Sequence, residues 1–383
     1  VGAGPAGLTT ARDLALRGYK VTVFEELPQP GGMLYWGIPS YRLPRKILEK
    51  EINDIRALGV EIRLNTRVGR EITFAKLEKD FHYVYLASGA HKSQKMNVPG
   101  EDLKNVFGGV EFLRDFNANE DKWLKGKSKL GKKVAVIGGG NSAIDAARIA
   151  VRLGADVTIL YRRLRQDMPA AQEEIKAAEE EGIKIEYLIA PLKIEGTKEK
   201  VSSITCQRMV LGDFDSSGRK KPAAVAGSEF TLKVDSVIAA IGQIPDMSFI
   251  DKKTGITINK WDCFDVNNDY KSRTPNPRYF AGGDAVTGPD TVIAAIAAGH
   301  QAADDIDTAI RKANKEPAYE KPVPEKIDVP LVIDEETVEA IQMVMPEISG
   351  SKRKMSFAEV ELGFKKADAI KEASRCLRCD AEL

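Results

Sequence analysis

The sequence predicts an α/β protein with two Rossmann-like dinucleotide-binding domains, the second inserted in the first, plus a helical C-terminal arm. Two glycine-rich fingerprints carry this prediction, one in residues 1–7 (VGAGPAG) and one in residues 136–143 (VIGGGNSA). The pattern around each fingerprint predicts a strand before the glycines and a helix after them. One such fingerprint alone is a weak signal. Each copy here also has the second strand that completes a βαβ unit.

The fingerprint glycines permit a tight turn from strand to helix. They also let a pyrophosphate lie against backbone N–H groups at the positive end of the helix. Residues of this kind are Gly2, Gly4, Pro5, Ala6 and Gly7 in the first unit, and Gly138, Gly140, Asn141 and Ser142 in the second.

The residues that end the second strand of each unit differ in charge. Glu25 lies 23 residues after Gly2, and its carboxylate can accept hydrogen bonds from both ribose hydroxyls while repelling a 2′-phosphate. Tyr161 holds the equivalent position in the second unit and is followed by Arg162 and Arg163. Guanidinium groups suit a 2′-phosphate. The sequence therefore predicts a different nucleotide in each unit.

Apolar runs and turn residues divide the chain into four segments. We expect residues 1–103 to form the first part of one domain, residues 104–240 the inserted domain, residues 241–313 the return to the first domain, and residues 314–383 a linker and an arm. The elements expected in the first domain are helices over 8–18, 45–58 and 291–310, and strands over 21–25, 60–64, 83–90 and 278–285. Four prolines between 317 and 330 predict an extended linker.

Composition excludes several classes of protein. The 57 basic and 56 acidic residues balance, so no overall field attracts nucleic acid or an anionic membrane. No apolar run approaches the roughly 20 residues needed to span a bilayer. Four scattered cysteines do not make a secreted disulfide scaffold, which favours a reducing, cytoplasmic compartment. Because the chain opens at Val1 without most of a first strand, we expect further residues before it.

Neither fingerprint has a nearby cysteine pair that could take electrons from a bound redox cofactor. The loop at 30–39 and residues 145–147, just after the second fingerprint, contain no cysteine, whereas disulfide reductases with two nucleotide units carry a close pair at one of these places. Electrons on such a cofactor must therefore pass to a small acceptor, to oxygen or to an iron–sulfur cluster. The histidines His82, His91 and His300 are too far apart in sequence to indicate a metal site.

Several motifs together resemble a known family. They are the fingerprint with Glu25, residues 32–39 with 42–44, residues 138–145, residues 161–163 with 168–170, and residues 281–284. From Val1 to about Ile310 the chain is similar to the small (beta) subunit of glutamate synthase, and equally to the flavin modules of dihydropyrimidine dehydrogenase and of NADH-dependent ferredoxin:NADP oxidoreductases. This resemblance implies a two-domain flavin disulfide reductase-like fold.

The resemblance also implies cofactors, partners and contacts. FAD is expected in the first unit, NADP(H) in the second, and an iron–sulfur domain or subunit as electron partner in a hetero-oligomeric complex. FAD contacts are implied at Gly4, Pro5, Ala6, Gly7, Glu25, Gly32, Leu34, Arg42, Val68, Gly89, Gly283, Asp284 and Val292. NADP(H) contacts are implied at Gly140, Asn141, Ser142, Arg162, Arg163 and Gly242.

No catalytic side chain is expected, because hydride passes directly from a nicotinamide to flavin N5 once the rings stack. The helix from Thr291 can point its positive end at the flavin edge that becomes negative on reduction. Sequence leaves open whether the flavin bifurcates electrons. The alternatives are a structural subunit with a vestigial nucleotide site and a disulfide reductase.

The end of the chain carries a Cys-x-x-Cys motif. Cys376 and Cys379 supply two ligands, whereas a cluster or structural zinc needs four. They are either half of a metal or cluster site completed elsewhere, or an ordinary pair in the arm.

Overall fold

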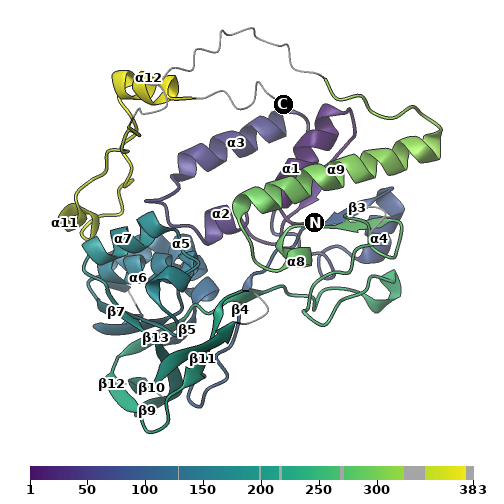
Figure 1. Ribbon diagram of the computed structural model, residues 1–383. Coiled ribbons are helices and arrows are strands. Elements are labelled where there is room, and N and C mark those ends of the chain that lie inside the picture. Colours follow the sequence, from purple (N-terminus) through teal and green to yellow (C-terminus); the bar gives the residue numbers. More distant parts are fainter. Residues whose placement is uncertain (128, 198–199, 215–217, 268–270, 323–340, 377–383) are drawn as a thin grey trace.

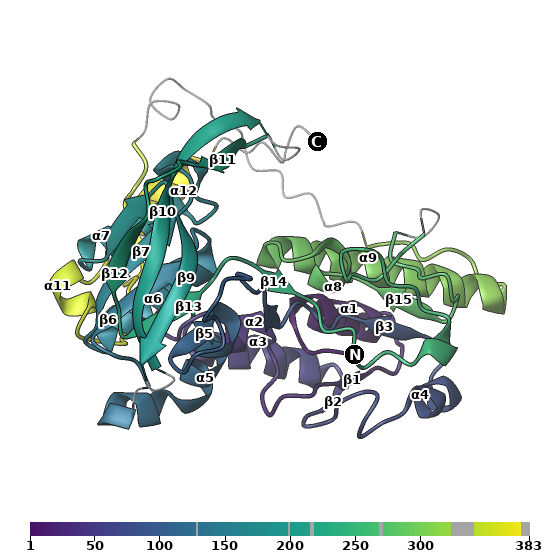
Figure 2. The ribbon, with the colours of Figure 1, turned by 90° about the horizontal axis from the view of Figure 1, so that it is seen from below.

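The computed structural model describes residues 1–127, 129–197, 200–214, 218–267, 271–322 and 341–376 (Figure 1). Two α/β units lie side by side, and the chain passes between them twice. The crossings are β4 (Lys92–Ser93) and β14 (Gln243–Ile244), which pair antiparallel. The second unit is therefore inserted in the first, as Figure 2 shows from below.

The first unit is built on a parallel sheet. Its named strands are β1 (Thr22–Phe24), β2 (Glu61–Arg63), β3 (Val84–Leu86) and β15 (Tyr279–Ala281), paired as β1 with β2 and β3 with β15. Residues 1–3 join the two pairs, because the Gly2 N–H donates to the Phe24 carbonyl at 2.8 Å and the Ala87 N–H donates to the Val1 carbonyl at 2.8 Å. The first fingerprint therefore begins in the middle of the sheet, between its two strand pairs.

Helices α1 (Pro5–Leu16) and α9 (Val292–Asn314) pack closely against each other (Figure 1). Small residues permit this contact. A Cβ atom at Gly299 would lie 2.6 Å from the Ala6 carbonyl oxygen, and the Thr10 hydroxyl donates to the Gly299 carbonyl at 2.9 Å. Pro5 opens α1, where its missing N–H costs no intrahelical bond. The packing fixes the starts of both helices at one edge of the sheet.

Shorter helices complete the first unit. They are α2 (Met33–Trp36), α3 (Arg45–Ala57), α4 (Phe74–Asp80), the 3₁₀ turn η3 (Lys252–Thr254) and α8 (Asp284–Thr287). Each expected helix and strand of this domain is present, with ends that differ from the expected ones by at most four residues.

The second unit contains a five-stranded parallel sheet in the order β5-β13-β6-β7-β8. The strands are β5 (Val106–Gly108), β6 (Lys133–Ile137), β7 (Asp156–Tyr161), β8 (Lys184–Tyr187) and β13 (Ser236–Ala239). The helices are α5 (Gly109–Lys122), η1 (Trp123–Lys127), α6 (Asn141–Arg152), η2 (Arg165–Asp167) and α7 (Gln172–Glu180). Because β6 and β13 are almost entirely buried, this sheet forms the centre of the unit.

In the chain segment between β8 and β13 there is a separate antiparallel sheet, which was not predicted from the sequence. Its strands are β9 (Ile189–Thr197), β10 (Lys200–Phe214), β11 (Lys220–Ala224) and β12 (Phe230–Lys233). The segment 96–103 packs against its core, and the Ile194 N–H donates to the Pro99 carbonyl at 2.8 Å. This packing favours a domain boundary near β4 instead of the boundary proposed at 103/104.

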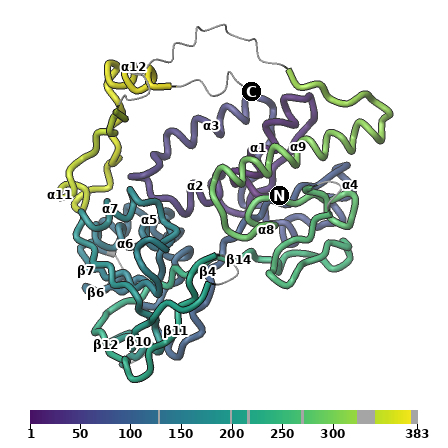
Figure 3. Tube along the Cα trace, in the orientation of Figure 1, coloured from purple at the N-terminus to yellow at the C-terminus, as the bar shows by residue number. Residues whose placement is uncertain are grey.

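The arm is less helical than expected. Its described part, residues 341–376, holds α11 (Gly350–Arg353) and α12 (Lys366–Ser374), joined by a non-helical stretch of turns and bends. Pro346 and Gly363 lie in the non-helical stretches. Figure 3 shows α11 next to α7 of the second unit. In the described ranges, no helix has both the length and the apolar character needed to cross a membrane.

Candidate functional site

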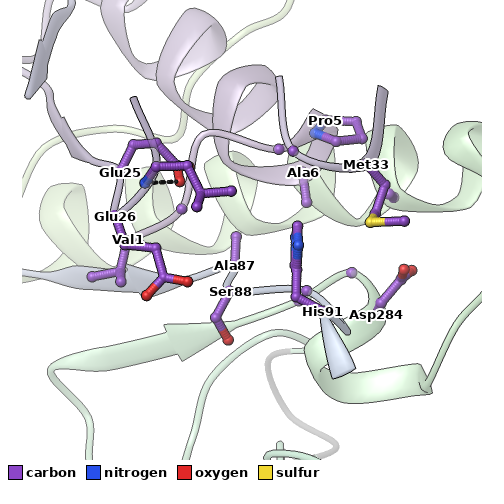
Figure 4. Close-up of a pocket in the computed structure, with 18 of the residues that line it drawn as sticks. Val1, Pro5, Ala6, Glu25, Glu26, Met33, Ala87, Ser88, His91 and Asp284 are labelled. Atoms are coloured by element: carbon purple, nitrogen blue, oxygen red, sulfur yellow. Dashed lines mark hydrogen bonds between the residues drawn. The ribbon is translucent and has the colours of Figure 1, made fainter. Parts of the chain in front are cut away.

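The first pocket lies where β1, β3 and β15 end, which is the binding edge of a doubly wound sheet (Figure 4). Most of the residues predicted for the first dinucleotide line it. They are Gly2, Gly4, Pro5, Ala6, Glu25, Gly32, Leu34, Val68, Gly89, Gly283, Asp284, Thr291 and Val292. Segments far apart in sequence, from residues 2 to 292, therefore meet at one site.

Gly7 and Arg42 do not line this pocket. A Cβ atom at Gly7 would lie 2.1 Å from the Gly2 carbonyl oxygen, so this glycine serves the close packing of strand and helix. Arg42 instead forms ion pairs at 2.8 Å with Asp145 and with Glu174, both in the second unit. The structure thus places Arg42 in a contact between the units and not on the first pocket.

Glu25 is buried at the end of β1 with its carboxylate fixed by backbone donors. One oxygen accepts from the Ala3 N–H at 2.7 Å and the other from the Leu27 N–H at 2.9 Å. Burial raises the pKa of Glu25, and these two hydrogen bonds oppose the rise. A carboxylate oxygen can accept a second hydrogen bond, so both retain capacity toward the pocket.

Two further side chains on this pocket were missed by the sequence analysis. The Ser88 hydroxyl is buried and has no hydrogen-bond partner among the described residues, which is the expected state of a group that contacts a ligand. The ring of His91 points toward Ala6 (Figure 4). Burial, together with the charge of Arg114, lowers the pKa of His91 to about 4, so the ring is uncharged at neutral pH. Its place just after the Gly89 turn was the available signal.

Asp284 begins α8 and faces the pocket, and burial raises its pKa to about 6. The Asp290 backbone partly offsets this rise. Asp290 also accepts from the Thr291 N–H at 2.7 Å, and the Thr291 hydroxyl caps α9 by accepting from the Ala294 N–H at 3.3 Å. The start of α9 is therefore held in a defined position beside the pocket.

The raised pKa of Asp284 predicts a pH effect on stability. The folded state holds this proton more tightly than the unfolded chain, whose aspartate pKa is near 3.8. The contribution of Asp284 to the free energy of unfolding is therefore greatest below about pH 4 and is lost as pH rises through about 6. The flavin-free protein and Asp284→Asn would be unfolded with urea between pH 4 and 7. We expect the free energy of unfolding of wild type, minus that of Asp284→Asn, to fall as the pH rises from 4 to 7. A difference that stays constant over this range would contradict the raised pKa of Asp284. Asp54→Asn, at an exposed site, is the control.

The second pocket lies at the ends of β6, β7 and β13. All residues predicted for the second dinucleotide line it: Gly138, Gly140, Asn141, Ser142, Arg162, Arg163 and Gly242. Gly138 has φ +139°, and a Cβ atom there would lie 2.1 Å from the Ala240 carbonyl oxygen. A side chain is thus excluded at the first glycine of the fingerprint, which keeps the turn tight.

The three arginines of the second pocket differ in setting. Arg162 is exposed. Arg163 is only 5% exposed, and its Nε donates to the Lys220 carbonyl at 3.0 Å. Arg219, from the turn between β10 and β11, also lines the pocket and was missed by the sequence analysis. The basic run 219–221 after a glycine was the only signal for it.

The two pockets meet at the start of α9, because Asp290 and Thr291 line both of them. The Gln243 amide donates to the Ser142 hydroxyl at 3.0 Å, which ties β14 to the second fingerprint beside this junction. Ligands in the two pockets can therefore approach each other at this point.

Cysteines are absent from both pockets among the described residues. Cys206 and Cys263 are buried elsewhere, and Cys376 is exposed just after α12. Cys379 lies outside the described residues. Over the described ranges, no three His, Cys, Asp or Glu side chains form a group able to hold a metal.

Two dinucleotide pockets that meet at a helix start define a class of protein, the two-domain nucleotide-dependent oxidoreductases. The family model described as pyridine nucleotide-disulphide oxidoreductase matches residues 1–299, and the chain belongs to this family. Membership confirms the predicted fold, the oxidoreductase class and the pairing of a flavin with a pyridine nucleotide.

Several curated proteins are similar to the chain over most of its length. The chain is 44% identical to the NADP(+)-dependent formate dehydrogenase subunit beta of Moorella thermoacetica, over 99% of this chain and 54% of that protein. It is 41% identical to the NADPH-Fe(3+) oxidoreductase subunit beta of Geobacter sulfurreducens, over 99% and 60%. It is 37% identical to the glutamate synthase [NADPH] small chain of Escherichia coli, over 80% and 67%, which confirms that resemblance. The chain thus spans little more than half the length of the first two relatives.

Solved structures share the fold. Mycobacterium tuberculosis FprA in complex with NADPH matches with TM-score 0.68 and 20% identity, covering 84% of this chain and 86% of FprA. The thioredoxin reductase of T. acidophilum matches with TM-score 0.59 and 21% identity, covering 82% and 97%. At these identities the likeness supports the architecture alone.

Proposed function

We propose that the chain is an FAD-dependent, NADP(H)-linked oxidoreductase module. It exchanges hydride between NADP(H) and FAD and passes electrons to or from iron–sulfur clusters within a larger complex. The observation that carries this proposal is the shared lining of the two pockets by Asp290 and Thr291, because hydride transfer requires the two rings to touch.

The first pocket fits FAD. Glu25 would accept from the adenosine ribose, and the backbone N–H groups at the start of α1 would hold the pyrophosphate. The unpartnered Ser88 hydroxyl and the Asp284 carboxylate are available to the rest of the cofactor. A bound flavin supplies two-electron exchange with a nicotinamide and one-electron exchange with metal centres.

Helix α9 supplies the electrostatics at this site. It is the longest helix in the described part of the chain, and its first N–H groups open at the pocket beside Val292. An N-terminus of this kind carries a partial positive charge, which stabilises negative charge placed against it.

The second pocket fits NADP(H). Its glycine turn can hold a pyrophosphate, while Arg162 and the neighbouring guanidinium groups form a cationic region at the end of β7. The relatives named for NADP(+) or NADPH support this choice. The sequence predicted the same preference from Arg162 and Arg163, which follow the uncharged Tyr161.

Electron partners are proposed from two observations. Three relatives are named as subunits or a chain of larger enzymes, which supports a hetero-oligomer. No cysteine lines either pocket in the described ranges, so a thiol relay lacks a donor at the flavin. We therefore propose an iron–sulfur domain or subunit as partner. We place the complex in the cytoplasm, in keeping with the buried thiols of Cys206 and Cys263.

The flavin itself tests the proposal. Flavin released from the purified protein by denaturation is compared with FAD and FMN standards by chromatography. We expect FAD, because Glu25 serves an adenosine ribose that FMN lacks. Release of FMN, or a folded preparation that takes up no flavin on reconstitution, would show that the first pocket has another use.

We further propose that Cys376 and Cys379 are half of a cluster site. Iron and acid-labile sulfide would be measured in the intact complex for wild type and for Cys376→Ser with Cys379→Ser. We expect the loss of one cluster while NADPH still reduces the FAD, because neither pocket is altered. Cys263→Ser, at a buried site outside the arm, should keep its iron. Unchanged iron content in the double variant would leave the pair as a feature of the arm alone.

A further inference from the structure

We propose that Arg219 determines specificity for the 2′-phosphate of NADP(H) together with Arg162, and that Arg163 is a positioning residue that holds Arg219 in place. The inference rests on the proposed NADP(H) site. Arg163, one of the two arginines that follow β7, then supports the site instead of contacting the phosphate. Arg219, from the hairpin of β10 and β11, takes its place in the contact.

Arg219 reaches the pocket from the antiparallel sheet. Strands β10 and β11 pair antiparallel from Met209 with Ala224 to Phe214 with Lys220. The hairpin projects from the body of the second unit (Figure 2). Arg219 directly precedes this last pair and lines the second pocket beside Tyr161 and Arg162. The hairpin therefore brings a third guanidinium group to the end of β7.

Arg163 is attached to the same hairpin. Its Nε donates to the carbonyl oxygen of Lys220, the residue after Arg219, at 3.0 Å. The side chain is almost fully buried, so it is not free to follow a ligand. The Arg163 carbonyl in turn accepts from the Leu188 N–H at 3.2 Å, which anchors its backbone before β9. These contacts join the end of β7 to the base of the Arg219 turn.

Basic and acidic residues line different parts of the second pocket. Among the described residues that line it, Arg162, Arg163 and Arg219 gather near Tyr161. The acidic Asp290 lines it with Thr291 at the start of α9, where the first pocket begins. Burial raises the pKa of Tyr161, and the charges of Arg163 and Arg219, which line the same pocket, oppose this rise. The cationic end is therefore the one that follows β7, where a Rossmann unit holds the adenosine ribose.

An exposed arginine beside that ribose matches the chemistry of a 2′-phosphate. The phosphate carries up to two negative charges and oxygens that accept from guanidinium groups in pairs. Arg162 from the strand and Arg219 from the hairpin can approach it from two directions. A nucleotide without the 2′-phosphate gains nothing from either, so both residues act on specificity and leave general nucleotide binding unchanged.

Titration calorimetry with adenosine 2′,5′-bisphosphate and 5′-AMP tests the inference without turnover. The FAD-loaded protein is compared with Arg219→Ala and Arg219→Lys. We expect Arg219→Ala to bind the bisphosphate about tenfold or more weakly with unchanged 5′-AMP affinity, and Arg219→Lys to lose less. Arg208→Ala is the matched control, because Arg208 is an exposed arginine of β10 outside the pocket. Retained discrimination in Arg219→Ala would overturn the assignment.

Hydrogen exchange separates the two roles. We expect Arg163→Ala to weaken bisphosphate binding and also to deprotect the backbone amides of residues 209–214, 220, 221, 223 and 224, since the hairpin loses its attachment. Arg219→Ala should leave that protection intact. Unchanged protection in Arg163→Ala would overturn its positioning role. If wild type binds both probes equally, the proposed NADP(H) site fails; if wild type discriminates and Arg219→Ala still does, only this inference fails.

Discussion

Glu25→Ala is expected to lose FAD while the second unit keeps its nucleotide site. The substitution removes the acceptor that we propose for the two ribose hydroxyls, and it leaves the Ala3 and Leu27 N–H groups without their carboxylate partner. Hydrogen bonds to a charged group contribute about 1.5–3 kcal/mol each, so the loss of two weakens FAD binding about a hundredfold or more. Flavin content after dialysis and a titration of the apoprotein with FAD measure this.

Neighbouring variants make the result specific. Glu26→Ala removes an adjacent carboxylate that lines the same pocket and pairs with Arg67 at 3.3 Å, and it should retain FAD. Glu25→Gln keeps the volume and one acceptor oxygen and should give an intermediate affinity. Wild-type FAD affinity in Glu25→Ala would show that this carboxylate does not hold the ribose.

Glu181→Ala is expected to lower the free energy of unfolding by about 3–5 kcal/mol, because it leaves the buried Arg152 guanidinium without its carboxylate partner, while Arg148 keeps its ion pair with Glu174. The fully buried Glu181 carboxylate accepts from Arg148 at 2.7 and 3.0 Å and from Arg152 at 3.0 Å. Tyr41 of the first unit lies against both guanidinium groups, with Arg152 4.0 Å from its ring centre. Urea denaturation measures the effect.

A surface glutamate provides the control. Glu179→Ala, two residues earlier, removes an exposed carboxylate that pairs with Arg165 at 3.4 Å and should cost less than about 1 kcal/mol. If Glu181→Ala costs no more than this control, the network around it is not a source of stability.

Contacts near this network join the arm to both units. Phe357 of the arm stacks on Phe116 of α5 with ring centres 5.1 Å apart, and the Val360 N–H donates to the Tyr41 carbonyl at 3.0 Å. Arg353, which is buried, pairs with Glu180 at the end of α7. The arm therefore contacts the second unit and the Tyr41 loop of the first unit together, next to the Arg42 ion pairs.

The sequence predicts those parts of the site that are local in the chain. A fingerprint, its helix and its closing residue lie within about 25 residues, and the backbone geometry follows from glycine and from strand spacing. Both pockets therefore contain almost every residue predicted for them. Helix α9 was also predicted, because its cap and its alanine-rich face are local features.

Long-range pairings account for what the sequence did not reveal. Arg42 meets Asp145 across 103 positions, and Arg163 meets Lys220 across 57, so neither partner is visible in a local pattern. The strands β9–β12 were not predicted, because residues 104–240 were interpreted as one continuous nucleotide-binding fold. Arg219 depends on that sheet for its place at the pocket, and its role could not be predicted without the sheet.

Anaerobic rapid mixing of the FAD-loaded protein with NADPH or NADH tests the central claim most directly. The two pockets meet at Asp290 and Thr291, so mixing with NADPH should bleach the flavin absorbance in a single turnover with no other protein present. Because Arg162 and Arg219 are proposed to bind the 2′-phosphate that NADH lacks, NADH at the same concentration should reduce the flavin at least tenfold more slowly. A flavin that NADPH does not reduce, or that NADH reduces equally fast, would contradict the account.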